Sequence, residues 1–557
     1  MCPGEARRCA DRVGAPTGHR GTVSARVARM GDDAAAPPLA DRPALFGRGP
    51  FFERTLERTV GAGRVDRRSA RLFARSPHAG AHRFEIRSLD DDGDRHDAQV
   101  EPPNPRVTDG TFSLLYPQEA PGGRALEPAT RYAFTVTHVA SGDVLGEGAF
   151  RTAPEPGSRA ARRFTFGVAS CHNPFNGDGR LDAAALRTLA VAPEALEAAG
   201  ASRLLLMGDQ VYGDLPASLS LFDPTFFRTV APPHRETIFD CTRDEVRSLF
   251  HERHRIFWKT DRFTDLMRGW ATHPILDDHE IVDNFGSAPE HGTARWAAIR
   301  EGALDAFHDY QARRVFGERR PPSFHHGFRH GDFAAFVMDL RSQRHVDGDS
   351  LWLFERSQLA DMRAFMRANG DARALVIVLS VPILHVPDWM ATLGGDLTGE
   401  GSDASDRWSH ERAHGSRDAL LALLEEHQEA HPEQRLVLVG GDIHVGCAVQ
   451  FRWKESSARA VQLVSSALSN HQGLAHRIAA ESAPAMRSVM GKGRRLYAEA
   501  TLIEGTNGAT RNPFGGLNFG VVDLETEGDE TSVRLRLMSA DEATMPSPIT
   551  VFDSGAL

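Results

Sequence analysis

Four apolar, strand-like segments of this chain each end at side chains that can bind metal ions. They are FTFGVASC, which ends at Cys171; RLLLMGDQVY, with Asp209 and Tyr212; HPILDDHE, with residues 277–280; and RLVLVGGDIH, with Asp442 and His444. In an open α/β sheet, the residues that follow parallel strands lie at one edge of the sheet. Because thiolates, carboxylates and imidazoles are metal ligands, we expect these segments to meet in one site.

Strand-like and helical segments alternate from about Arg163 onward. The strand candidates are short, nearly continuous apolar runs: RFTFGVAS, RLLLMG, FAAFVMDL, ALVIVLSV, RLVLVGG and AVQLVSSAL, followed near the C-terminus by LNFGVVDLET and SVRLRLMSA. The helical candidates are DEVRSLFHERHRIFWKT, ARWAAIREGALDAFHDYQARRVF, ERSQLADMRAFMRA and SRDALLALLEEHQEA. Alternation on this scale predicts an α/β domain.

Residues 67–151 show a different pattern, in which short alternating runs are separated by turn residues. The runs include SARLFAR, HRFEIRS, GTFSLLYP and TRYAFTVTHV, and this spacing indicates an antiparallel β-sandwich. The segment LEPATRYAFTV, followed by GEGAFRTAP, resembles the end of a fibronectin type III domain, with Tyr132 at the tyrosine-corner position. We therefore expect a fibronectin III-like domain over residues 60–153 and a second domain over residues 160–557. Residues 1–45 have little apolar periodicity and are predicted to be disordered.

Composition argues against several classes of protein. A net charge of -10 argues against general nucleic-acid binding, since such proteins need a basic face. Five cysteines in 557 residues, without a CxxC spacing, do not indicate a disulfide framework. No stretch approaches the roughly 18 apolar residues of a membrane span. The first residues, MCPGEARRCADRV, lack the apolar region of a secretory signal, which favours a cytoplasmic location.

Six segments, taken in order, resemble those of the PhoD-like alkaline phosphatases, relatives of the calcineurin-like metallophosphoesterases. They are FGVASC, MGDQVYGD, ILDDHEIVDNFG, MDLRSQR, ERSQLADM and VGGDIH, so the resemblance covers roughly residue 163 to the C-terminus. It implies a fold of the α/β (α+β) class, with a metallophosphoesterase-type β-sandwich flanked by helices. An N-terminal fibronectin-like domain also fits that family. Similar proteins are often exported, so the location of this one stays open.

The resemblance also assigns roles to individual residues. It implies six metal ligands: Cys171, Asp209, Tyr212, Asp278, Asp442 and His444, with Asp209 bridging two ions. His279 would lie beside the metals, and Asn284 and Arg341 would face the phosphate. The family's pairing of metals implies Fe³⁺ with Ca²⁺ in a dinuclear or larger centre, with Zn²⁺, Mn²⁺ and Mg²⁺ as alternatives. A thiolate suits iron or zinc, carboxylates suit calcium, magnesium or manganese, and a phenol with a reference pKa of about 10 favours trivalent iron as its partner.

Simpler interpretations remain for several of these side chains. A lone cysteine after a strand is often a small buried hydrophobe, and an aspartate there often caps a turn. Arg341 also suits an ion pair with Asp339 or another carboxylate. His172 is an alternative second ligand. The histidines of HHGFRH have no carboxylate beside a strand end, and we interpret them as part of a surface loop.

Together these features predict hydrolysis of phosphate esters by a metal-bridged hydroxide, with His279 protonating the leaving oxygen. The substrate would be a phosphorylated small molecule or a phosphodiester. Three alternatives stay open: a phosphodiesterase or phospholipase D-like hydrolase, a catalytically weak phosphate-binding protein, and a structural protein without metal. The long segments from Gly213 to Thr272 and from Pro387 to His414 are predicted to form lids or pocket walls.

Overall fold

A computed structural model describes residues 56–91, 93–102, 104–259, 262–383, 405–471, 488–492 and 495–557. All of them belong to one unit, Pro38–Leu557. The segment over residues 1–45 that the sequence predicts to be disordered lies outside the described residues. Most of the predicted pocket wall between Pro387 and His414 lies outside them as well.

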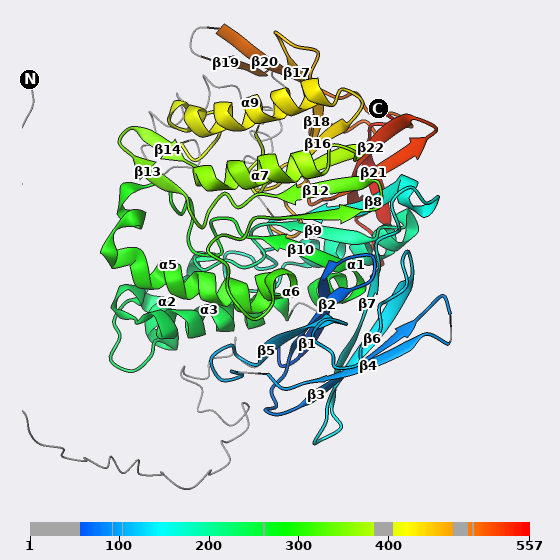
Figure 1. Ribbon diagram of the computed structural model, residues 1–557. Helices are drawn as coiled ribbons and strands as arrows, with labels where there is room; N and C mark the ends of the chain where they lie inside the picture. The colour runs from blue at the N-terminus through cyan, green and yellow to red at the C-terminus, as the bar shows by residue number, and fades with distance from the viewer. Residues whose placement is uncertain are drawn as a thin grey trace, which may run out of the picture. The chain divides into compact units, whose positions relative to one another are not determined.

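The first large sheet has nine strands in the order β23-β22-β21-β8-β9-β10-β1-β2-β5 (Figure 1). Strands β8, β9 and β10 run parallel, and β21 pairs antiparallel with β8. The bounds are β1 Thr59–Val65, β2 Ala70–Arg75, β5 Thr111–Tyr116, β8 Arg163–Ala169, β9 Arg203–Met207, β10 Ala271–Ile275, β21 Phe519–Glu527, β22 Glu530–Ala540 and β23 Pro548–Asp553.

The second large sheet has eight strands in the order β11-β12-β15-β16-β18-β17-β20-β19. Strands β12, β15, β16 and β18 run parallel to one another. The bounds are β11 His326–His330, β12 Phe333–Val337, β15 Ala374–Val378, β16 Arg435–Gly440, β17 Cys447–Trp453, β18 Arg459–Val464, β19 Ser488–Lys492 and β20 Arg495–Leu502.

The two sheets pack face to face, and helices cover their outer faces. On β9, Leu205 lies in the core between the sheets, whereas its neighbours Leu204 and Leu206 pack outward with α1 (Ala183–Ala199) and α4 (Phe263–Gly269). This alternation explains why the strands are apolar on both faces. Helices α7 (Arg356–Ala368) and α9 (His414–Ala430) cover the second sheet (Figure 1). The predicted α/β class and helix-flanked sandwich are confirmed.

The N-terminal strands form the predicted β-sandwich. A four-stranded sheet of order β4-β3-β6-β7 packs on β1, β2 and β5 through a core that includes Leu72, Phe84 and Phe134. The Tyr132 hydroxyl accepts a hydrogen bond from the Glu127 N–H at 2.9 Å, as in a tyrosine corner. The bounds are β3 His82–Ser88, β4 Arg95–Val100, β6 Arg131–His138 and β7 Val144–Arg151. The boundaries at residues 60–153 and 160–557 stay a prediction.

One interpretation from the sequence is wrong. HHGFRH does not form a surface loop, because His326–His330 is strand β11, paired antiparallel with β12. A turn of two residues joins the strands, and Gly331 adopts a positive φ of 59° within it. The ring of His330 is buried and stacks on Phe164. The strand forms despite its polar composition because the side chains of Phe328 and His330 are buried on one face.

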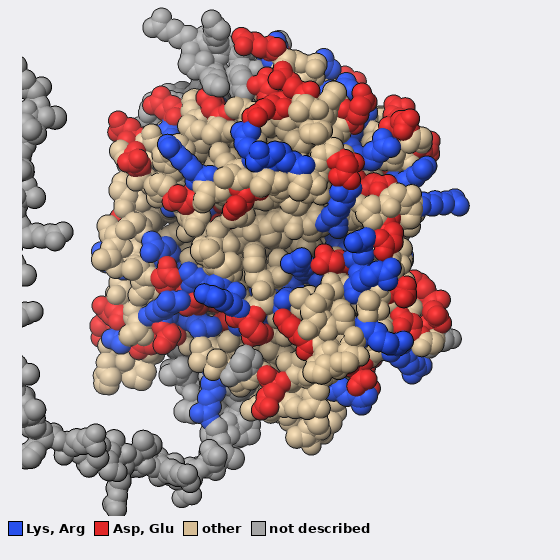
Figure 2. All heavy atoms as spheres, in the orientation of Figure 1, with Lys and Arg blue, Asp and Glu red and all other residues tan. Residues whose placement is uncertain are grey.

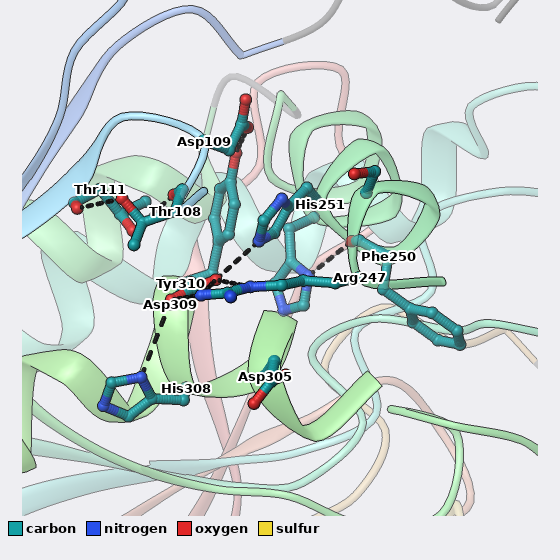
Figure 3. Close-up of polar contacts among 12 residues, drawn as sticks. Thr108, Asp109, Thr111, Arg247, Phe250, His251, Asp305, His308, Asp309 and Tyr310 are labelled. Atoms are coloured by element: carbon teal, nitrogen blue, oxygen red, sulfur yellow. Dashed lines mark hydrogen bonds and ion pairs between the residues drawn. The ribbon is translucent and has the colours of Figure 1, made fainter. Parts of the chain in front are cut away.

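The described residues of the segment between Gly213 and Thr272, which is predicted to form a lid or pocket wall, include three α-helices: α2 Pro224–Val230, α3 Arg243–Trp258 and α4. Helix α3 presents Arg243, Arg247 and His251 at intervals of four residues, so these side chains share one face. That face meets Asp305 of α5 (Ala294–Phe307) and Asp309 of the following π-helical turn (His308–Ala312) (Figure 3). Helix α3 therefore forms part of a helical layer with α5 and the π-helical turn.

The same π-helical turn contacts the N-terminal sandwich. The hydroxyl of Tyr310 donates a hydrogen bond to Asp109, a residue of the loop that leads into β5 (Figure 3). Asp109 also accepts from Arg75 of β2 at 3.1 Å and from Arg255 of α3 at 3.1 Å. The half-buried carboxylate of Asp109 thus joins the sandwich to two elements of the helical layer.

Candidate metal centre

The sequence-predicted ligands lie at the carboxyl ends of parallel strands in both sheets. Cys171 follows the end of β8 by two residues, Asp209 follows β9 by two, and Asp442 follows β16 by two. Asp277 and Asp278 come directly after β10 and Leu276. Open α/β sheets bind their ligands at this edge.

Two glycines allow the chain segments to approach closely here. A Cβ atom on Gly208, which has a φ of +99°, would lie 2.4 Å from Cβ of Asp277. A Cβ atom on Gly441 would lie 2.4 Å from Oγ of Ser170. Larger residues would therefore push the strand ends apart.

Several site residues have backbones in the left-handed region, which is unfavourable for residues other than glycine. Their φ values are 56° for Cys171, 59° for Asp209, 54° for Asn284, 68° for Asp442 and 54° for His444. Such conformations cost roughly 1 to 3 kcal/mol each and persist where the surrounding structure enforces them. Their concentration among the proposed site residues marks this edge as a functional site.

The carboxylate of Asp209 is the centre of a buried cluster of acidic groups. The Cys171 thiol and the Tyr212 hydroxyl each donate to Oδ2 of Asp209, both at 3.4 Å. The other oxygen, Oδ1, has no hydrogen-bond partner although Asp209 is 1% exposed. Asn470 donates to the Tyr212 hydroxyl at 3.1 Å. Cys171, Asp209 and Tyr212, predicted from separate motifs, are thus brought together.

The electrostatics of this cluster fit a bound cation. Burial, and then the charge of Asp209, raise the pKa of Cys171 and of Tyr212 well above their usual values. Burial also raises the pKa of Asp209 well above that of an exposed carboxyl. A cation would stabilise the deprotonated forms of all three groups. Oδ1 of Asp209, which has no hydrogen-bond partner, is available as a ligand atom for such an ion.

Two groups of side chains within the described residues have ligand atoms within 4.8 Å of one another. One comprises Asp209, Asp278 and His279, and the other Asp277, Asp278 and Asp442. Asp278 is fixed by the backbone N–H groups of His279 at 3.0 Å and Asn284 at 2.6 Å. Although burial raises the pKa of Asp278, the Arg341 guanidinium brings it below the usual range.

Neither group includes Cys171 or His444. The Ser466 hydroxyl links these two residues, because it lies 3.0 Å from the Cys171 sulfur and accepts the His444 N–H at 2.9 Å. The ring of His444 is half-buried. His172 instead uses both ring nitrogens elsewhere, Nδ1 with the Ser469 hydroxyl at 2.8 Å and Nε2 with the Phe257 carbonyl at 3.0 Å.

His279 lies beside the acidic cluster with its ring over Tyr212, at a centroid distance of 4.3 Å. Its Nδ1 lies 2.8 Å from Oδ1 of Asp214. Burial lowers the pKa of His279, but Asp214, Asp278 and Asp209 together raise it well above its usual value. The carboxylates around it therefore favour the protonated form of the imidazole.

Arg341 takes the alternative role that the sequence left open. Its guanidinium is fully buried, donates to Asp406 at 3.0 and 2.7 Å, and pairs with Asp277. It also lies 3.6 Å from Asp278 and 3.8 Å from Asp442. Asp339 accepts the Arg341 backbone N–H rather than its side chain.

Sequence reasoning assigned no role to Asp214 or Asp406, and it named Glu280 only as one of the potential ligands at residues 277–280. Glu280 accepts backbone N–H groups from Asp209 at 2.9 Å, from Gln210 at 2.7 Å and from Asp277 at 2.8 Å. It therefore holds the two loops together, and burial raises its pKa to about 7. The sequence offered a local signal for two of these residues: Glu280 is the third carboxylate of the motif DDHE, and Asp214 is the second aspartate of GDQVYGD. Nothing in the local sequence marks Asp406.

The described residues thus form a helix-flanked β-sandwich with a buried cluster of acidic groups at its strand ends. A family model described as PhoD-like phosphatase matches residues 166–500, and the chain belongs to this family. It is accordingly a phosphatase-type protein, whose family acts on phosphorylated substrates and suggests metal cofactors.

Comparison with solved structures agrees on the fold. The structure of PhoD is similar at a TM-score of 0.60, with 13% identity over 88% of this chain and 88% of that chain. The FN5 domain of Drosophila Lar matches 18% of this chain and 97% of its own at 15% identity, with a TM-score of 0.14. No curated protein sequence matches the chain at a significant level. None of the helices in the described ranges combines the length and apolarity needed to cross a bilayer.

Proposed function

We propose that this chain hydrolyses phosphate esters in a metal-dependent reaction. The observation that carries the proposal is the environment of Asp209. One of its oxygens accepts from Cys171 and Tyr212, and the other is buried without a hydrogen-bond partner. A carboxylate desolvated in this way is costly unless a cation compensates its charge.

The ligands that we propose are Cys171, Asp209, Tyr212, Asp278, Asp442 and His444. The thiol and phenol favour Fe³⁺ at one position, and the carboxylates favour Ca²⁺ at the other, with Zn²⁺, Mn²⁺ or Mg²⁺ as alternatives. When bound, such ions would lower the pKa of a coordinated water molecule and neutralise charge on the phosphoryl group.

The remaining side chains hold and move protons. His279, kept protonated by the carboxylates around it, is the general acid for the leaving oxygen, and Asp214 fixes the orientation of its ring through Nδ1. General acid catalysis of this kind contributes typically 10² to 10⁴-fold. Asn284, next to Asp278, would face the phosphate, as the family's motif implies.

The test is a parallel assay of an aromatic phosphate monoester and the matching diester, with metal-loaded and chelator-treated protein. We expect turnover of at least one ester by the loaded protein and its loss on chelation. Preference for the diester would identify a phosphodiesterase instead of a phosphomonoesterase. Tight binding of inorganic phosphate with no turnover above the chelated control would overturn the proposal in favour of a binding protein.

A further inference from the structure

The proposed site needs a positive group that can reach an anionic substrate. Arg341 is not suited to this role, since its guanidinium has no exposed surface and is paired with Asp277 and Asp406. Releasing it would take a cationic partner away from the buried carboxylates of Asp277 and Asp406, which is unfavourable. Arg344 is equally buried and pairs with Asp406.

Arg407 lies at the same edge but is differently placed. Its NH1 pairs with Oδ2 of Asp442, the proposed ligand that follows β16. The side chain of Arg407 is 14% exposed, whereas those of Arg341 and Arg344 are 0% exposed. Its side chain therefore combines contact with the site and partial access to solvent, although its NH1 is itself buried.

The residues on either side of Arg407 fix its backbone. Asp406 is fully buried between the guanidinium groups of Arg341 and Arg344 and also accepts from the Ser287 hydroxyl. Trp408 is fully buried and donates its indole N–H to the Val381 carbonyl at 3.0 Å. With both neighbours anchored in the protein, the Arg407 side chain begins from a fixed point beside Asp442, which reduces the entropy lost when it binds a ligand.

From this geometry we propose that Arg407, rather than Arg341, contacts the phosphate group of the substrate. The inference rests on the proposed function and names the residue that recognises the anion. A guanidinium presents a planar set of donors that matches two phosphate oxygens. An incoming phosphate would compete with Asp442 for those donors. Asp406 is then a positioning residue, which acts through the backbone of Arg407.

The experiment compares Arg407→Ala, Arg407→Lys and the control Arg363→Ala. Arg363 lies on α7, where its exposed side chain pairs with Glu426. For each purified, metal-loaded protein we would measure the dissociation constant of inorganic phosphate by calorimetry, the KM and kcat for an aromatic phosphate monoester, and the metal content. We expect Arg407→Ala to weaken phosphate binding and raise KM by about 10- to 100-fold with metal content unchanged, because charged hydrogen bonds are lost. Arg407→Lys should recover part of the loss, and Arg363→Ala should match the wild type.

Unchanged phosphate affinity in Arg407→Ala would overturn the inference, and so would loss of metal from that variant, which would mean that Arg407 only supports Asp442. The phosphate measurement does not depend on turnover. If the wild-type protein hydrolysed no ester while Arg407→Ala still lost phosphate affinity, the proposed function would fail and the assignment of Arg407 would stand.

Discussion

Asp209 connects several parts of the proposed site. Its carboxylate meets the thiol of Cys171 and the phenol of Tyr212, and its backbone N–H is held by Glu280. It shares a group of ligand atoms with Asp278 and His279. Its backbone φ of 59° shows that the fold enforces this placement against local preference.

Replacing Asp209 should therefore cost far more activity than replacing His279. We expect Asp209→Asn to lose more than the roughly 10⁴-fold upper limit of general acid catalysis, whereas His279→Asn should lose about 10² to 10⁴-fold. Steady-state kinetics of both variants on one phosphate ester would check this ranking. Equal losses, or a larger loss in His279→Asn, would contradict a central role for Asp209.

The sequence predicted the site residues that directly follow strands. It did not predict the residues that contact them from distant parts of the chain. Asp209, Asp278 and Asp442 were predictable because each follows an apolar run, and parallel strands align their ends. The burial of Arg341 was not predictable, because it depends on Asp406, which is 65 positions away in the chain. The partial exposure of Arg407 was not predictable either, because it also depends on tertiary packing.

At the level of elements, strands with a clear apolar or alternating pattern were recognised, and strands with a weak local pattern were not. The runs that became β8, β9, β12, β15 and β16 are continuous in apolar residues. Strands β1, with three small glycine or alanine residues, and β4, with the sequence RHDAQV, carry weak local signals. Their strand conformation comes from pairing with β2 and β3. The π-helical turn at residues 308–312 likewise has no signature in the sequence.

The contact between the sandwich and the helical layer depends on Asp109. Because Asp109→Ala would leave Arg75 and Arg255 without their partner, we expect the free energy of unfolding to fall by about 3 kcal/mol. Asp371→Ala removes the partner of Arg329 from an exposed pair and should cost less than about 1 kcal/mol. Chemical denaturation of both variants measures the difference. A similar small loss in both would show that the Asp109 contact stabilises little.

A second element-level prediction concerns the contact between β10 and β11. Burial lowers the pKa of His326 to about 4, and its Nε2 lies 3.1 Å from Nδ1 of His273. The folded protein keeps His326 neutral, whereas the unfolded chain takes up a proton below about pH 6.5. The contribution of His326 to the free energy of unfolding is therefore fully present above pH 6.5, and it declines as the pH falls toward 4.

From pH 7 to pH 5, His326 should therefore lower the free energy of unfolding by about 2 kcal/mol. Urea denaturation of the wild type and of His326→Asn at both pH values isolates this contribution, because the variant lacks the titrating group. The wild type should lose more stability than the variant. An identical loss in both proteins would show that His326 does not contribute to the acid sensitivity.

At the scale of the molecule, the N-terminal sandwich is continuous with the large sheet. Strand β1 pairs in parallel with β10 at Ala62 and Ala271, so β1, β2 and β5 extend the nine-stranded sheet. Figure 2 shows one face of the molecule, on which Lys and Arg side chains are interspersed with Asp and Glu side chains.

A chain truncated to residues 154–557 should consequently fold poorly. Removing β1 exposes the edge of β10 and leaves Arg255 and Tyr310 without Asp109. We expect loss of soluble protein or a strongly lowered Tm, measured by solubility and thermal denaturation beside the full-length chain. A truncated chain with wild-type Tm and ester hydrolysis would show that the sandwich is an independent module.

The most direct test of the central claim is elemental analysis of the native protein beside its Cys171→Ala and Asp209→Asn variants. We predict a stoichiometric metal content in the native protein, a reduced content in Cys171→Ala and near-complete loss in Asp209→Asn, with all three proteins folded by circular dichroism. Native protein that contains no stoichiometric metal after loading, or an Asp209→Asn variant that retains the native metal content, would contradict the claim that these side chains share bound ions.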